Sequence, residues 1–437
     1  MFGFFERCVL VLVSINLNSV EGAKKSMKKR IVVVAEYFPP RLGADRRIFE
    51  LMRRLSAKYD IHFVTLPPSY TLFIRKIDPH DKQKPEVAYQ RMRGHRLSLP
   101  EFISRFWTKS FLIAFMVTET YLCLQVLRRM ARLKPDIVII NDTSAYTGLL
   151  GFICSKILHK KLVVDYNDLM GLYTMELIGK KMSRSLQMIL GRMLVLVEDT
   201  LVRHGWKVTT ITVFIKNYAA TRKIRNDITV IPNGVDTSLF NPAKVTGVDI
   251  YGKYGVRSGK KLCVYAGRVD EVAGAEIILE TAKLLKNEKS IKFMIVGEGN
   301  PKMLNELSKC DNVILTGRVP KESIPKYLAA ADCVLVPFPD TVASHGISPL
   351  KLFEALAMEK PVIASAISGI TEVAHQDPNV VLVSKDPKQW ASAVKKLAIE
   401  NSENSTQRRQ NSGKAVRQKY DFDHLAALFD EVLEGGL

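Results

Sequence analysis

Cysteine is scarce and scattered in this sequence. Six cysteines occur in 437 residues, no two of them form a C-x-x-C pair, and none has histidine partners at metal-ligand spacing. This pattern excludes a zinc finger and a disulfide-stapled domain. The cysteines are expected to be small core residues of a protein kept in a reducing compartment, which favours the cytoplasm, and no metal or other cofactor is expected.

The short motifs of several large enzyme classes are also missing. A dinucleotide-binding domain would need G-x-G-x-x-G directly after its first strand, and Tyr37-Phe38-Pro39-Pro40 stands there instead. No Walker A, G-x-S-x-G or H-E-x-x-H pattern occurs. The sequence therefore argues against a Rossmann dehydrogenase, a P-loop nucleotidase, an α/β-hydrolase and a zinc metalloprotease.

The N-terminus has no long apolar run. Cys8 to Leu17 is apolar but too short to span a bilayer, and Val20-Glu21-Gly22-Ala23 is a poor cleavage site. A signal peptide or an anchor stays open as an alternative. The preferred interpretation is that residues 1–26 form an extension outside the folded domains, because Met27-Lys28-Lys29-Arg30 leads directly into a first strand.

Acidic residues are too few to balance the basic ones. Lys and Arg number 64 against 44 Asp and Glu, which gives a net charge of +20. Such an excess favours a polyanionic partner: a phosphate-rich ligand, an anionic membrane or nucleic acid. The basic residues occur in scattered clusters without an RRM, KH, zinc-finger or basic-zipper pattern, so nucleic acid is not expected as a partner.

One segment, Phe102 to Leu127, is dense in apolar and aromatic residues but is interrupted by charges. Too many charges interrupt it for a transmembrane span. Two interpretations remain: an amphipathic helix at an anionic membrane surface, flanked by Arg91, Arg93, Arg96 and the cluster 128–132, or a long helix packed on the first sheet.

Apolar runs and helical periodicity alternate along the rest of the chain. Continuous apolar runs such as 31–35 and 261–266 are typical of parallel strands buried on both faces, and helical patterns follow them. This rhythm predicts an α/β protein with two successive Rossmann-like domains, residues 27–236 and 237–418, with a hinge near Asn233-Gly234. Residues 419–437 form a last helix.

The stretch from Ser344 to Ser365 carries the strongest functional signal. Ser348 is a good N-cap and Pro349 a good first helical residue, so free backbone N–H groups and the positive helix end should meet a diphosphate there. Lys351 and Glu354 lie three residues apart on one helical face and could hold a phosphate and a hydroxyl. The structural alternative is an ordinary surface Lys–Glu pair.

Glycines follow several predicted strands, at the sheet edge where parallel α/β domains bind ligands. In the second domain these are Gly267-Arg268, Gly297 and Gly317-Arg318-Val319, which together favour a nucleoside-diphosphate pocket. In the first domain the corresponding loops contain Gly43, Asp142 and Asp168. Either aspartate could orient a hydroxyl or assist proton transfer, although helix capping is the preferred interpretation for Asp142.

These loops together resemble the retaining GT-B glycosyltransferases of family 4, from about Arg30 to the C-terminus. The motifs that carry the resemblance are Tyr37-Phe38-Pro39-Pro40 with Gly43, Ile231-Pro232-Asn233-Gly234, Gly267-Arg268, Val296-Gly297-Glu298-Gly299, Gly317-Arg318-Val319-Pro320 and Ser348-Pro349-Leu350-Lys351-Leu352-Phe353-Glu354. It implies an acceptor domain followed by a donor-nucleotide domain, an interdomain site, and a last helix that crosses back to the first domain. It assigns the donor ribose to Glu354, the diphosphate to Arg268 and the base to the loop 317–319.

The chain departs from the family pattern at three positions. Gly346 stands where relatives often have a glutamate that meets the transferred sugar, and Ala273 stands where they commonly have a phosphate-binding lysine. Backbone N–H groups at 346–348 and Lys351 are expected to supply the lost contacts. Asn167, beside Asp168, occupies the place where relatives often have a histidine.

The sequence and the resemblance predict a retaining hexosyl- or N-acetylhexosaminyltransferase that needs no metal. Its partners would be a nucleotide-sugar donor and a glycan or lipid-linked acceptor, with peripheral contact to an anionic membrane. The catalytic candidates are Asp168, Arg268 and Lys351. The donor-binding candidates are Gly43, Gly267, Arg268, Gly297, Gly317, Arg318, Val319, Gly346, Ile347, Ser348, Lys351 and Glu354. The alternatives are a nucleotide-sugar epimerase or hydrolase of the same shape, and a degenerate protein that only binds.

Overall fold

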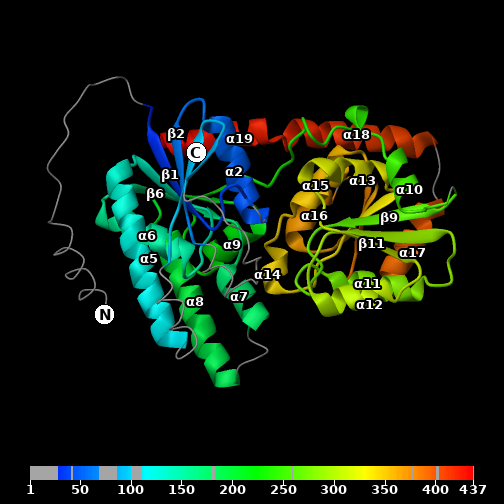
Figure 1. Cartoon of the computed structure of the whole chain (residues 1–437), viewed down its shortest axis with the longest axis horizontal. Coiled ribbons are helices and arrows are strands. Elements are labelled where there is room, and N and C mark those ends of the chain that lie inside the picture. Colours follow the sequence, from blue (N-terminus) through cyan, green and yellow to red (C-terminus); the bar gives the residue numbers. More distant parts are fainter. Residues whose placement is uncertain are drawn as a thin grey trace.

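The computed structural model describes residues 28–40, 43–67, 86–99, 111–178, 183–257, 259–375, 377–399 and 403–436. These residues form two α/β domains side by side along the long axis of the molecule, each with helices on both faces of a sheet (Figure 1). The predicted fold class is confirmed. The N-terminal extension predicted for residues 1–26 lies outside the described residues.

The first domain is built on an eight-stranded sheet in the order β3-β4-β2-β1-β5-β6-β7-β8, in which β3 alone is antiparallel to its neighbour. The strands are β1 (Arg30–Ala35), β2 (Asp60–Thr65), β3 (Glu86–Tyr89), β4 (Met92–Arg96), β5 (Ile137–Ile140), β6 (Lys161–Tyr166), β7 (Lys207–Thr210) and β8 (Ile228–Val230). Alternate residues of β1 enter the two hydrophobic clusters on opposite faces of the sheet. This explains why its sequence is a continuous apolar run.

Within the described residues, six helices between Gly43 and Thr221 accompany this sheet. They are α2 (Gly43–Leu55), α5 (Phe111–Leu133), α6 (Thr147–Ile157), α7 (Met170–Ile178), α8 (Arg184–His204) and α9 (Val213–Thr221). Residues of α2 pack on one face of the sheet, and residues of α5 and α6 pack on the other.

Helix α5 decides part of the question left open for the segment 102–127. Leu122, Val126 and Met130 are completely buried in the first-domain core, together with Cys123 and Leu127. This face of α5 packs on the sheet, so it is not available to a membrane. Residues 102–110 lie outside the described residues.

The second domain has a six-stranded, wholly parallel sheet in the order β11-β10-β9-β12-β13-β14. Its strands are β9 (Lys261–Ala266), β10 (Ile291–Val296), β11 (Val313–Gly317), β12 (Cys333–Val336), β13 (Val362–Ser365) and β14 (Val380–Val383). Its helices are η2 (Pro242–Lys244), α10 (Val248–Lys253), α11 (Ala275–Leu284), α12 (Pro301–Ser308), η3 (Lys321–Ser323), α13 (Ile324–Ala330), α14 (Val342–His345), α15 (Leu350–Ala357), α16 (Ser368–Ala374) and α17 (Pro387–Ile399).

The last two helices run along both domains (Figure 1). Helix α18 (Glu403–Lys419) packs on α15, and α19 (Phe422–Glu434) packs on α2 of the first domain. Phe429 of α19 is completely buried in the first-domain core. The Tyr59 hydroxyl also lies 2.6 Å from a carboxylate oxygen of Asp430 and 2.7 Å from one of Glu434, so α19 is an integral part of the first domain.

The hairpin β3–β4 was not predicted. Strand β4 reads Met-Arg-Gly-His-Arg, a charged pentapeptide without the apolar pattern of a buried strand. It joins the sheet because His95 is buried against His62 of β2, with Nε2 of His95 2.8 Å from Nδ1 of His62. Burial lowers the pKa of both histidines, so they enter the sheet as a neutral pair.

The cysteines within the described residues are free thiols, and four of the five are buried. This agrees with their predicted role as core residues. No helix in the described ranges combines the length and the apolar character needed to cross a bilayer.

Candidate functional site

Three strands of the second domain end at one rim. Strands β9, β10 and β11 are followed or closed by Gly267, Gly297 and Gly317. The N–H of Gly267 donates to the carbonyl of Val296 at 3.0 Å, and a Cβ on Gly297 would lie 1.9 Å from the Gly267 carbonyl oxygen. Only glycine permits this approach, so Gly267 and Gly297 form a close-packed backbone rim, and Gly317 continues it through a backbone bridge to Gly297.

The residues after Gly317 diverge. The guanidinium of Arg318 is exposed and donates to the carboxylate of Glu298 at 3.2 Å. Val319 is half-buried and packs against the second-domain core. The contact of this loop with a nucleotide base therefore stays a prediction.

Arg268 extends from the rim toward the first domain. Its Nε donates to a carboxylate oxygen of Asp270 at 2.7 Å, and an Nη lies 3.4 Å from the Tyr173 hydroxyl of α7. Its side chain is 42% exposed. The predicted arginine thus lies at the domain interface, where its fork is oriented by one group from each domain.

Lys351 lies beside the same rim, in an aromatic pocket. Its Nζ is 4.3 Å from the ring centre of Tyr265 and 4.6 Å from that of Phe338, and it donates to the Tyr265 hydroxyl at 3.3 Å. Burial, assisted by the nearby Arg268 and opposed by Asp270 and Glu354, lowers the pKa of Lys351 from 10.5 to about 7. An anion placed on the rim would restore the charge of this amine.

The predicted cap of α15 is wrong by one residue. Pro349 has extended backbone angles and holds the N-cap position, so the helix begins at Leu350 and Ser348 precedes the cap. The amide of Asn233 donates to the Ser348 carbonyl at 2.5 Å and keeps the chain extended at this point. The Ser348 hydroxyl is buried and finds no hydrogen-bond partner in the described part of the chain, as expected of a group that meets a ligand.

Glu354 and Lys351 do not pair with each other, although they share α15. The carboxylate of Glu354 turns toward the first domain and lies 3.2 Å from the guanidinium of Arg46 on α2. Its side chain is 11% exposed. Gly43, predicted from the first-domain loop, is the first residue of α2, less than one turn before Arg46.

Further contacts tie the loop before α15 to the first domain. The Thr212 hydroxyl donates to the Gly346 carbonyl at 3.3 Å, and Ile347 packs against the second-domain core. Nearby, the carboxylate of Glu372 accepts from the backbone N–H groups of Val213 and Phe214 at 2.7 and 2.8 Å. It thus caps α9 of the other domain. The two domains are held together at the loop that sequence motifs assign to the donor.

On the first-domain side, the predicted aspartates have different surroundings. Asp142 accepts from the Ser144 N–H at 2.9 Å and from the Thr147 hydroxyl at 2.6 Å, so it orders the loop before α6, but the capping role preferred for it is wrong because Tyr146 holds the N-cap position. Asp168 is half-buried at the start of α7, one turn or more before the Tyr173 that contacts Arg268. Asn167 is buried and donates to the Asn141 carbonyl at 2.8 Å.

A buried carboxylate connects these first-domain loops. Glu198 of α8 accepts from the Tyr166 hydroxyl at 2.7 Å, from the Gly171 N–H at 3.0 Å and from the Thr143 hydroxyl at 3.4 Å. Burial raises its pKa to about 7. It holds the ends of β5 and β6 and the start of α7 in fixed positions.

Five residues of the site were not predicted from the sequence: Tyr265, Phe338, Asp270, Arg46 and Glu198. Tyr265 and Phe338 looked like ordinary residues at strand ends, and Glu198 like a charge on a helix. One signal was available for Asp270, because it follows Gly267-Arg268 at a spacing that lets an aspartate orient the arginine. The other four acquire their positions only through packing between distant segments.

Comparisons with known proteins match both domains. The sequence profile described as "Glycosyltransferase Family 4" matches residues 42–239, and that described as "Glycosyl transferases group 1" matches residues 260–400. A curated relative, D-inositol 3-phosphate glycosyltransferase of Xylanimonas cellulosilytica, is 28% identical over 218 residues, which cover 47% of this chain and 50% of the relative. The chain thus spans about half the length of the curated relatives it matches.

Solved structures share the whole fold. Sucrose-phosphate synthase of Thermosynechococcus elongatus superposes with a TM-score of 0.70 at 17% identity, over 93% of this chain and 99% of that protein. Anabaena HepE in complex with UDP and glucose gives a TM-score of 0.67 at 15% identity over the same shares. At these identities the likeness concerns the two-domain architecture.

Proposed function

This chain belongs to glycosyltransferase family 4, and on that premise we propose that it transfers a sugar from a nucleoside diphosphate donor to a glycan or lipid-linked acceptor with retention of configuration. The donor would lie between the domains, on the glycine rim of the second. HepE, which shares this fold, binds UDP and glucose, and this supports a nucleotide-sugar donor here, for which we propose a hexose or N-acetylhexosamine. No step of the proposal needs a metal.

The observation that carries the proposal is the position of two cations beside one backbone rim. Arg268 and Lys351 both lie at Gly267, and a Cβ on this glycine would be 3.6 Å from the Lys351 amine. Asp270 forms an ion pair with Arg268 from one side, whereas Lys351 has aromatic neighbours and no carboxylate within ion-pair distance in the described part of the chain. A diphosphate fits this unbalanced charge.

The same groups explain how the glycosidic bond would break. Negative charge on the diphosphate grows as the sugar leaves, and Arg268 and Lys351 would stabilise that charge in a site with little water. Lys351 needs a nearby anion to be protonated at neutral pH, because its pKa is about 7 in the free protein. The leaving phosphate would accept the acceptor proton, and Asp168 would orient the acceptor hydroxyl.

Helix α8 supports a lipid-linked acceptor. Leu186, Ile189, Met193 and Leu196 are 48, 58, 59 and 65% exposed, and their spacing places them on one face of α8. Exposed Arg192 lies beside them. Because α7, which begins beside Asp168, packs on α8, this face would hold a lipid near the acceptor site at the cytoplasmic surface of a membrane.

Product analysis tests the proposal. Nucleotide sugars are first screened by thermal shift, and the stabilising donor is incubated with glycan and lipid-linked acceptors. We expect an acceptor-dependent product whose anomeric configuration, read by proton NMR, equals that of the donor. Inversion would refute the retaining mechanism, donor turnover without acceptor would favour a hydrolase or epimerase, and donor binding without any turnover would favour a protein that only binds.

The lipid part has its own measurement. We expect flotation of the wild-type protein with vesicles containing anionic lipid, weakened by salt and by replacing Leu186, Ile189, Met193 and Leu196 with serine. Unchanged flotation of that variant would contradict the role of α8.

A further inference from the structure

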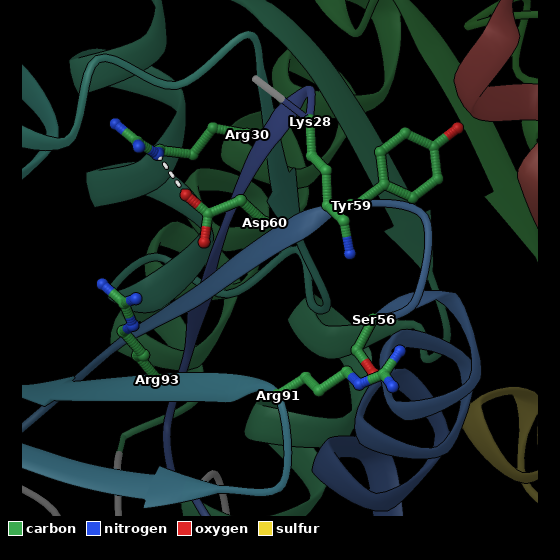
Figure 2. Close-up of a pocket in the computed structure, with 7 residues that line it drawn as sticks. All are labelled: Lys28, Arg30, Ser56, Tyr59, Asp60, Arg91 and Arg93. Atoms are coloured by element: carbon green, nitrogen blue, oxygen red, sulfur yellow. Dashed lines mark hydrogen bonds and ion pairs between the residues drawn. The ribbon is translucent and has the colours of Figure 1, made fainter. Parts of the chain in front are cut away.

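A second concave surface lies at the opposite end of the first sheet from the donor site. Its lining residues are Lys28, Arg30, Ser56, Tyr59, Asp60, Arg91 and Arg93, which surround about 330 Å³ (Figure 2). Strands β1, β2 and β4 are parallel and all begin here, whereas the loops of the donor and acceptor sites follow strand ends. One strand length, roughly 17–20 Å, separates the two edges.

Positive charge dominates this pocket. Four of its seven lining residues are Lys or Arg, and Asp60 is the one carboxylate among them. That carboxylate is already bound by Nε of Arg30 at 2.7 Å and faces Nε2 of His62 at 3.1 Å. Although burial acts to raise it, these neighbours lower the pKa of Asp60, so it stays ionised and paired. The other three cations have no counter-charge in the pocket.

Two of the cations are unpartnered, and the third is anchored. Within the described part of the chain, the guanidinium groups of Arg91 and Arg93 make no hydrogen bond or ion pair, and both side chains are exposed. The Lys28 amine donates to the carbonyl of Ala57, which fixes it over the pocket. Figure 2 shows Lys28 reaching down beside Tyr59 toward Arg91, with Arg93 on the side of Arg30 and Asp60, while the Tyr59 hydroxyl points away from the arginines.

The hairpin that carries these arginines is held in place by the core. Arg91 and Arg93 flank Met92, which is completely buried, and Gly94 packs so closely on Phe38 that a Cβ there would lie 2.3 Å from that ring. His95 is buried against His62. The two exposed guanidinium groups are therefore mounted on a rigid strand, which lowers the entropic cost of binding an anion with both.

We propose that Lys28, Arg91 and Arg93 form a binding site for a phosphate group, separate from the donor site. Two guanidinium forks and one amine match the several acceptor oxygens of a phosphate better than the two oxygens of a carboxylate. The pocket accommodates a phosphate with a small attached group, and its concave shape does not suit an extended polyanion. The phosphate belongs either to a soluble molecule or to a lipid headgroup.

The test uses the full chain and compares two double variants of equal charge change. Arg91→Glu with Arg93→Glu removes the site, and Lys286→Glu with Lys302→Glu alters two exposed lysines of the second domain as the control. All four positions are exposed, and thermal melts verify that each variant is folded. The probes are inorganic phosphate and pyrophosphate in calorimetry, and flotation with phosphatidylcholine vesicles with and without phosphatidic acid, both at 150 mM salt.

We expect the pocket variant to bind at least one probe tenfold more weakly than the wild type and the control variant to match the wild type. Loss with the soluble anions identifies a soluble phosphate, and loss with the phosphatidic acid vesicles alone identifies a lipid headgroup. The proposal is overturned if the wild type binds neither probe, if the pocket variant still binds as the wild type does, or if both variants lose binding equally. The proposed donor site would also bind pyrophosphate, but it is unchanged in both double variants, so the difference between the pocket variant and the control variant tests this pocket separately from the proposed function.

Discussion

The two sides of the domain interface differ in the polar groups that they present around the proposed donor site. The second-domain side presents two cations, Arg268 and Lys351, on a rim of close-packed glycine backbone. The first-domain side presents carboxylates and amides at the ends of β5 and β6, with Glu198 buried behind them. Cations suit a departing diphosphate, and hydrogen-bond acceptors suit the hydroxyl groups of a sugar acceptor.

The two sides also differ in how they are held together. Backbone contacts between glycines shape the second-domain rim, whereas side-chain hydrogen bonds from Glu198 to three separate segments shape the first-domain side. Replacing a cation on the rim should therefore change chemistry more than stability. Replacing a polar group on the first-domain side should change stability more than donor binding.

The largest expected effect is that of Arg268→Ala. Removing the fork beside the rim should lower kcat roughly 10²–10³-fold, and Arg268→Lys should lower it less because the lysine keeps the charge but loses the bidentate geometry. The melting temperature should change little, since the side chain is 42% exposed. Steady-state kinetics at saturating donor measures this. Wild-type rates in both variants would show that Arg268 has only a structural role.

The next effect is that of Glu354→Gln. We expect donor affinity to weaken by about 1–3 kcal/mol, or about 5–150-fold, because a charge-assisted hydrogen bond to the ribose is lost. Calorimetry with the donor measures it. The matched control is Arg46→Gln, which breaks the same interdomain ion pair but leaves the Glu354 carboxylate. Equal weakening by both variants would assign the effect to the domain contact.

The difference between backbone features that are local in the chain and side-chain contacts between distant segments also explains what could be predicted from the sequence. The fold follows from apolar runs, and the rim from glycines that must follow strands, because both signals are local in the chain. Strand β4 was missed because its burial depends on the partner His62, 33 residues from His95. Whether α5 packs inside or lies at a surface was left open, because periodicity alone does not say what covers an apolar face.

The site residues divide in the same way. Arg268, Lys351 and Glu354 were found from a motif, but their partners Tyr173, Tyr265 and Arg46 come from segments more than eighty residues distant. Ser348 was misplaced as a cap because Asn233 of the hinge, not the local sequence, fixes its backbone. Local chemistry can be predicted from one sequence, and the pairing between the two domains cannot.

A smaller loss of donor affinity, about tenfold, is expected from Lys351→Met. Donor affinity of the wild type should fall as pH rises through about 7, at most tenfold per pH unit, because the amine must be protonated to meet the diphosphate. In the variant this pH dependence should disappear.

The folding stability of the Lys351→Met protein should be higher than that of the wild type, although its donor affinity is lower. A lysine whose pKa is about 7 in the folded protein and near 10.5 when unfolded costs stability, most at low pH and least above 10.5. Lys351→Met should therefore raise the melting temperature, more at pH 6 than at pH 9. A lower melting temperature at both pH values would mean that the amine is not desolvated.

The absent family lysine gives a further check on Lys351. Ala273 donates its N–H to Asp270 at 2.9 Å, at the same rim, so a lysine there could reach the same diphosphate. Ala273→Lys should partly restore the donor affinity of the Lys351→Met protein and do little in the wild type. Strictly additive effects in the double-mutant cycle would show that the two positions do not share a ligand.

The smallest effect on turnover is expected from Glu198→Gln on the first-domain side. Donor affinity should stay within about threefold of the wild type, because Glu198 contacts only first-domain groups. The main consequence of Glu198→Gln concerns stability.

The pKa of Glu198 is about 7 in the folded protein, whereas its ordinary value is 4.5. The wild type therefore loses stability as pH rises from about 4.5 to 7, and the glutamine variant does not. Measured by chemical denaturation, the stability of the variant relative to the wild type should increase by about 1–3 kcal/mol between pH 5 and pH 8. Two results would contradict the proposed difference between the two sides. One is a relative stability that does not change with pH, and the other is a donor affinity that falls as far as in Glu354→Gln. Either would mean that Glu198 does not act only on the structure of the first-domain side, with donor binding left to the second domain.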